Sequence, residues 1–267
     1  MILSRSPLPI VFACLLFAPL PAHAAATASQ ASPFLFSPSA LAPAPARGWV
    51  VLLPGENEFA FNALEPHYEK MALLLNANGF DTLIVPYDEA YDEGLDGDPD
   101  ADGDRIAAVT LRALHWMHAT HPETDGEPGA MIAWAEGARG LWSLVATGSK
   151  YPLVNLVAAA AFYPAVDDET PFNSRLPVLV QEGAQDDGEK TLRRYLAMRV
   201  PGSVEPELVV HDGAARGFDV DLFAKPKTIR SLPLIGTSTT LAYNAPAAYT
   251  AGQKMLAFLK ARLEAPE

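Results

Sequence analysis

The chain has 267 residues, a formal net charge of −13 at pH 7 and a single cysteine, Cys14. Its length suits one globular domain, and its excess of acidic residues makes nucleic acids and anionic membranes poor partners, because their phosphates would be repelled. A lone cysteine allows no disulfide within the chain.

Residues 1–24 have the features of a cleavable signal peptide. They carry one positive charge at Arg5, an apolar run over residues 10–20 and a small-x-small triplet at residues 22–24. The apolar run is too short to span a bilayer, so a membrane anchor is disfavoured. We therefore predict cleavage after Ala24, export to the periplasm or beyond it, and no membrane contact by the mature protein.

Residues 25–47 are rich in Ala, Pro and Ser, which is typical of a flexible leader, and the folded domain is expected over residues 48–267. Within that domain, apolar runs typical of strands alternate with helical patterns. The strands are predicted at residues 49–53, 82–85, 130–134, 154–162, 177–180 and 207–211. The helices are predicted at residues 64–78, 104–119, 137–147, 189–198 and 247–263. This alternation predicts an α/β fold in three αβα layers around a mostly parallel sheet.

An acidic run before the second of these helices offers carboxylates at alternate positions. Asp98, Asp100, Asp102 and Gly103 match the first, third, fifth and sixth positions of a calcium-binding loop. The twelfth position is Val109 instead of a bidentate glutamate, so other oxygen ligands would be needed. Two interpretations stay open: a weak calcium site, and a solvated acidic loop that favours the first turn of the helix. No other cofactor is indicated.

The sequence around Ala135 has the strand, sharp turn and helix of a nucleophile elbow. A buried strand is expected over residues 130–134, and a helix opens directly after the turn. Small residues stand where the strand and the helix must approach closely, at Ala133, Gly137 and Gly140. The position that would carry the nucleophile is Ala135, so the hydroxyl or thiol is missing.

Three later segments complete a set of four motifs in a fixed order. Residues 176–187 form a strand and an acidic turn, residues 208–218 form a strand followed by a small-residue turn, and residues 241–248 lead into the last helix. With the elbow, they make the domain resemble the dienelactone hydrolase family of α/β-hydrolases over about residues 49–259. This resemblance implies the α/β-hydrolase fold.

The resemblance places the family's catalytic triad at Ala135, Asp186 and Arg216, and only the acid is of the matching type. Ala135 has no lone pair for attack, and a guanidinium stays protonated, so it cannot act as the histidine would. Asp186 and Arg216 are expected to form an ion pair instead. We therefore predict a catalytically inactive pseudo-hydrolase.

A ligand site can outlive the triad, because the oxyanion hole of this fold is made of backbone N–H groups. The resemblance places these groups at Glu136 and at the loop of Gly55 and Glu56. Trp134 and Tyr87 lie at strand ends and are candidates for ligand contact, although core packing is the alternative for Trp134. The predicted ligand is a small organic acid or ester.

Two other interpretations stay open. In the first, the ion pair only stabilises the domain and the pocket holds nothing. In the second, the protein is an active carboxylic-ester hydrolase with a non-standard nucleophile. Ser143 lies two helical turns beyond Ala135, which favours helix packing, and His211 ends a strand five residues before Arg216.

Overall fold

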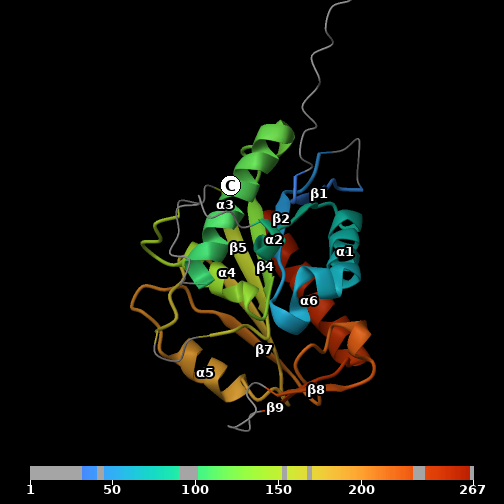
Figure 1. Cartoon of the computed structure of the whole chain (residues 1–267). Coiled ribbons are helices and arrows are strands. Elements are labelled where there is room, and N and C mark those ends of the chain that lie inside the picture. The colour runs from blue at the N-terminus through green and yellow to red at the C-terminus, as the bar shows by residue number, and fades with distance from the viewer. Residues whose placement is uncertain are drawn as a thin grey trace, which may run out of the picture. The chain divides into compact units, whose positions relative to one another are not determined.

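A seven-stranded, mostly parallel sheet forms the middle layer of the fold (Figure 1). The computed structural model describes residues 32–40, 45–90, 102–151, 155–166, 170–230 and 238–264. The strand order is β1-β3-β2-β4-β5-β6-β7, and only β1 runs antiparallel to its neighbour. The strands are β1 (Leu35–Ser37), β2 (Trp49–Leu53), β3 (Asp81–Ile84), β4 (Gly129–Trp134), β5 (Leu156–Phe162), β6 (Val178–Gly183) and β7 (Glu207–His211). The predicted α/β class is confirmed.

Helices cover both faces of the sheet, with α3 and α4 on one face and α1 and α6 on the other (Figure 1). The helices are α1 (Phe61–Ala77), α2 (Tyr87–Ala90), α3 (Asp102–Thr120), α4 (Gly137–Val145), α5 (Glu189–Ala197) and α6 (Ala245–Leu263). Five of them match the predicted helices to within three residues at each end. In the described part of the chain, no helix is long and apolar enough to cross a bilayer.

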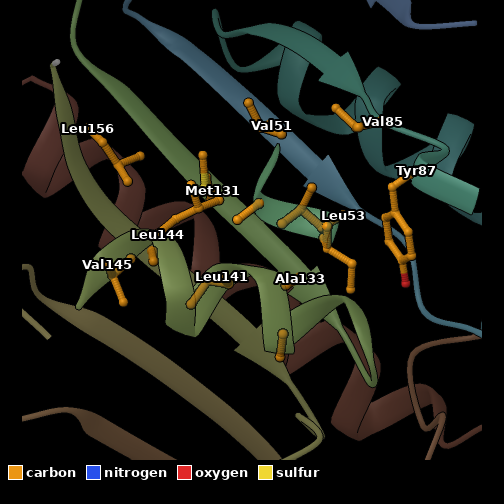
Figure 2. Packing of buried hydrophobic residues seen from close by; sticks show 14 of the residues in the cluster. Val51, Leu53, Val85, Tyr87, Met131, Ala133, Leu141, Leu144, Val145 and Leu156 are labelled. Atoms are coloured by element: carbon orange, nitrogen blue, oxygen red, sulfur yellow. The ribbon is translucent and has the colours of Figure 1, made fainter. Parts of the chain in front are cut away.

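The strands are apolar on both faces because each face meets a helix layer. In β2, Trp49, Val51 and Leu53 join the core under α3 and α4, while Val50 and Leu52 join the core under α1 and α6. This alternation follows from the two-residue period of a strand. Figure 2 shows the first of these cores, where side chains of β2 and β4 pack against α4.

The segment expected to be a flexible leader contributes to the folded unit. Leu35–Ser37 forms β1, which pairs with β3 in the register Leu35 to Ile84, and Phe34 is buried beside Trp116. Residues 25–47 are therefore not a leader throughout, and the compact unit starts at Ser32. Backbone pairing with β3 and the burial of Phe34 hold this strand to the sheet. The predicted signal peptide, residues 1–24, lies outside the described residues.

A small second sheet consists of β8 (Lys227–Arg230) and β9 (Ser238–Leu241), which pair antiparallel. The sequence pattern does not predict this sheet, because both strands are short and mostly polar. A bridge between Arg216 and Leu241 joins this two-stranded sheet to the segment after β7.

The chain order changes direction at β2. The strand that follows β2 lies on one side of it, and β4 lies on the other side. At such a switch point, the loops after the two strands diverge and leave a crevice at their carboxyl ends. Gly55 and Glu56 follow β2 at this crevice, and Ala135 follows β4.

Candidate functional site

The turn at Ala135 keeps the strained backbone of a nucleophile elbow. Its φ is +46°, in the left-handed region that side-chain-bearing residues seldom adopt. The Ala135 N–H donates to the carbonyl of Phe162 at 3.1 Å, and the Ala135 carbonyl accepts from the N–H of Ala165 at 2.9 Å. These two hydrogen bonds hold Ala135 in a backbone conformation that is unfavourable for a residue with a side chain.

Close approach of the strand loop and the helix explains the glycines beside this turn. A Cβ atom at Gly137 would lie 2.2 Å from the carbonyl oxygen of Pro54 and 2.6 Å from that of Leu53. A Cβ at Gly140 would lie 2.2 Å from the Cγ2 of Ile106 on α3. Gly137 therefore permits the close approach of strand and helix that the sequence pattern indicated, whereas Gly140 permits α4 to pack against α3.

Asp186 follows β6 and Arg216 follows β7, so both lie at the carboxyl ends of the strands, as Ala135 does. The Arg216 Nη1 lies 3.3 Å from the Asp186 Oδ2, and its Nη2 lies 4.0 Å from the Glu136 Oε1. Burial opposes the charge on Arg216, but the carboxylates of Asp186 and Glu136 outweigh it and raise the pKa of the guanidinium above its ordinary value. The expected ion pair is present, and Arg216 stays protonated.

Two aromatic rings flank the guanidinium of Arg216. Its central carbon lies 5.6 Å from the ring centre of Phe59 and 5.4 Å from that of Tyr163. Both distances fall within the range of cation–π attraction. Arg216 is therefore held by charge on one side and by aromatic faces on two others.

A cavity of about 440 Å³ opens next to this group. Its lining residues are Glu56, Asn57, Glu58, Phe59, Glu136, Arg216, Ile229, Thr239 and Leu241. The last three come from β8 and β9, and the first five come from the loop after β2 and from the elbow.

Comparison with solved structures identifies the architecture. A dienelactone hydrolase-like promiscuous phosphotriesterase from metagenomic libraries is similar, with a TM-score of 0.60 at 21% identity over 85% of this chain and 91% of that chain. A dienelactone hydrolase from Anabaena variabilis gives 0.56 at 13% identity over 86% and 91%. A thermophilic esterase from Thermogutta terrifontis gives 0.55 at 11% identity over 85% and 86%.

The chain has the α/β-hydrolase fold. No family model matches the sequence, and no curated protein matches it. The solved structures confirm the fold that the four motifs implied. Likeness at this level of identity shows the fold, and the activity has to be argued from the site.

The backbone donors expected at the oxyanion hole of this α/β-hydrolase fold differ in their environment. The Gly55 N–H donates to the hydroxyl of Tyr68 at 3.1 Å, so it already has an acceptor inside the protein. Within the described residues, no acceptor contacts the N–H of Glu136. Glu56 and Glu136 line the cavity, whereas Gly55 is not one of its lining residues. Glu136 is thus the better placed donor.

The expected ligand contacts of Trp134 and Tyr87 are corrected by the structure. Both side chains are almost fully buried, and neither lines the cavity. Tyr87 packs in the core near Leu53 (Figure 2), and its hydroxyl donates to the carbonyl of Pro54 at 2.9 Å. Internal partners for their polar atoms let both residues pack in the α/β-hydrolase core.

Asp219, which no sequence pattern singled out, is a buried carboxylate close to the elbow. Its side chain is 5% exposed and accepts from the Trp134 Nε1 at 2.9 Å and from the Tyr163 hydroxyl at 2.8 Å, with the His67 Nε2 at 3.5 Å. Burial disfavours its charge, but these neighbours outweigh that effect and lower the pKa of Asp219 below its ordinary value. An acidic residue between apolar Phe218 and Val220 was the available signal.

Of the predicted calcium ligands, Asp98 and Asp100 lie outside the described residues, and Asp102 begins α3, where only its backbone is described. No group of three or more His, Cys, Asp or Glu side chains suited to a metal ion occurs within the described residues.

Neither alternative catalytic side chain lines the cavity. Ser143 faces α3, where a Cβ at Gly103 would lie 2.8 Å from its hydroxyl oxygen. His211 is buried, and its Nε2 contacts the Gln181 Oε1 at 2.9 Å. Burial and the charge of Lys254 lower the pKa of His211, which fits an uncharged ring held inside the fold.

Proposed function

We propose that this protein is a non-catalytic member of the α/β-hydrolase fold that binds a small uncharged ester or lactone in the cavity beside Arg216. The observation that carries the proposal is the combination of a preserved elbow and cavity with a missing nucleophile and base. Ala135 has the strained φ of an elbow residue, and Arg216, which lines the cavity, stands where the family resemblance places the base.

Hydrolysis by the usual route needs a nucleophile and a base that can accept its proton. The methyl group of Ala135 offers neither electrons nor a proton, and Arg216 is held in its charged form by Asp186. In a characterised triad, loss of the nucleophile or the base alone lowers turnover by a factor on the order of 10⁶. We therefore expect no turnover above background.

The charges around the cavity favour an uncharged ligand over an organic acid. Glu56 pairs with Arg105 at 2.8 Å, Glu58 pairs with Lys227, and Arg216 pairs with Asp186. A carboxylate ligand would have to compete with Asp186 and Glu136 for the guanidinium of Arg216, and it would meet the negative charges of Glu56 and Glu58 in the cavity lining. An ester carbonyl needs only hydrogen-bond donors and avoids that repulsion.

Donors and apolar surface are both available for such a ligand. Within the described residues, Arg216 donates one hydrogen bond, to Asp186, which leaves most of its N–H groups for a ligand. The N–H of Glu136 is a second donor. Phe59, Ile229 and Leu241 supply apolar contact for the remainder of the ester.

The test is isothermal titration calorimetry of the purified protein with phenyl acetate and with γ-butyrolactone. Sodium acetate is titrated in the same way as the charged comparison ligand. The same samples are checked for released phenol. We expect saturable binding of an ester or lactone, weaker binding of acetate and no phenol above background. Arg216→Met should weaken binding at least about tenfold, because it removes charge-assisted donors.

Arg193→Met is the matched control, because Arg193 pairs with Glu189 on the exposed face of α5, away from the cavity lining. Equal binding by both variants would contradict the proposal. Phenol release that disappears in Asp186→Ala would instead support the ester hydrolase with an unrecognised nucleophile. Export through residues 1–24 remains a separate proposal, based on the sequence alone.

A further inference from the structure

Backbone strain marks the surroundings of the cavity. Four non-glycine residues within the described part of the chain have positive φ, and three of them lie at the site. Asn57 lines the cavity, Ala135 is the elbow residue, and Tyr163, at φ +36°, contacts Arg216 and Phe59. Strained residues persist where the surrounding structure holds them, and they concentrate at functional sites.

Tyr163 is held in this conformation from both ends. Its N–H donates to the carbonyl of Gln181 at 2.7 Å, and its hydroxyl donates to the Asp219 Oδ1 at 2.8 Å. The ring is fully buried. Since the hydroxyl meets an ionised carboxylate out of water, this hydrogen bond belongs to the stronger, charge-assisted class.

Asp219 connects three parts of the site that are distant in sequence. Its other oxygen accepts from the indole of Trp134, the residue directly before the elbow, while Tyr163 follows β5. Asp219 itself lies three residues after Arg216. The buried carboxylate of Asp219 therefore joins β4, which precedes Ala135, the ring of Tyr163 and the segment that carries Arg216.

We propose that Asp219 is a positioning residue, which holds the ring of Tyr163 against Arg216 so that the guanidinium faces the cavity in one fixed orientation. This inference rests on the proposed function, because it gives Arg216 the role of ligand donor. The ring of Phe59 lies on the same guanidinium and completes an aromatic clamp of Phe59 and Tyr163. The clamp reduces the side-chain entropy that Arg216 would lose on binding a ligand.

The test follows the side chain of Arg216 directly. In protein labelled with ¹⁵N-arginine, the Nε–Hε resonance of Arg216 is identified by its absence in Arg216→Met, and its heteronuclear NOE reports rigidity. Asp219→Asn and Tyr163→Phe should each shift this resonance and lower the NOE. Tyr151→Phe is the control, since it removes a hydroxyl that donates to the carbonyl of Asp104 instead.

Phenyl acetate binding is measured on the same variants, and we expect a loss of about fivefold to tenfold for Tyr163→Phe and none for Tyr151→Phe. An Arg216 resonance unchanged in both Tyr163→Phe and Asp219→Asn would overturn the inference, whatever their stability. If Arg216→Met binds phenyl acetate as the wild type does, the proposed function fails, while the resonance still decides whether Asp219 positions Arg216.

Discussion

Replacing Arg216 with methionine would leave the carboxylate of Asp186 buried without its partner. The side chain of Asp186 is 2% exposed and that of Arg216 is 16% exposed, with 3.3 Å between their charged atoms. At an effective dielectric constant of about 20, this distance corresponds to a gross attraction of about 5 kcal/mol. Part of that energy offsets the desolvation of both groups, so we expect the single change to lower the free energy of unfolding by about 3 kcal/mol.

A double-mutant cycle separates the pair from the loss of either side chain. Asp186→Asn keeps an oxygen for the N–H of Gly188, which donates to the Asp186 Oδ1 at 2.8 Å. The double variant therefore removes both charges without leaving either unpaired, and it should be clearly more stable than the sum of the single changes predicts. Urea unfolding of the four proteins at pH 7 gives the coupling energy, which we expect near 2 kcal/mol.

High salt provides an independent check on the same pair. Because both groups are largely buried, raising the ionic strength should change the coupling energy little, unlike that of exposed ion pairs. A coupling energy below about 0.5 kcal/mol would refute the view that an ion pair has replaced the catalytic contact.

Three further predictions concern single residues of the elbow and of the strands beside it. Burial and the charge of Asp186 raise the pKa of Glu182 well above its ordinary 4.5, so Glu182→Gln should raise the free energy of unfolding at pH 7. This gain should fade as the pH falls toward 4.5, because Glu182 is then protonated in the unfolded chain as well. A gain in the free energy of unfolding that persists at pH 3 would contradict this cause. Ala135→Gly should change the free energy of unfolding by less than about 0.5 kcal/mol, because relief of the left-handed φ offsets the lost methyl contact. Ala133→Gly in β4 should lower the free energy of unfolding by about 1 to 2 kcal/mol. Equal losses for the two variants in urea unfolding would show that the backbone of Ala135 is not strained. Gly137→Ala should lower the thermal midpoint through a loss of about 3 kcal/mol, because its Cβ would collide with the carbonyl of Pro54, and an unchanged midpoint would contradict that contact.

The sequence predicted the central strands and the long helices well because their signals are local. Strand β2 reads as a continuous apolar run, and the small residue Gly137 marks the close approach of helix α4 to the end of β2. The meeting of Asp186 and Arg216 came from the resemblance to a family with a known order of motifs, since 30 residues separate them.

Features that depend on tertiary contacts escaped prediction. Strand β1 is only three residues long in an Ala- and Pro-rich region, and its place is decided by pairing with β3. Tyr87 lies just after strand β3, as expected, but its hydroxyl donates to the carbonyl of Pro54 and its ring is buried in the core. The partners of Asp219 come from segments up to 152 residues away, as in its contact with His67, so no local pattern could assign them.

The antiparallel strand β1 has a consequence for where this domain can be shortened. A protein that starts at Gly48, where the composition changes, would lack β1 and would leave the backbone N–H and C=O groups along Asp81–Ile84 open at the edge of the sheet. It would also lose Phe34 from its place beside Trp116. An unpaired edge of this kind is a template for pairing with other chains. We therefore expect a protein that lacks β1 to aggregate more readily than the full chain.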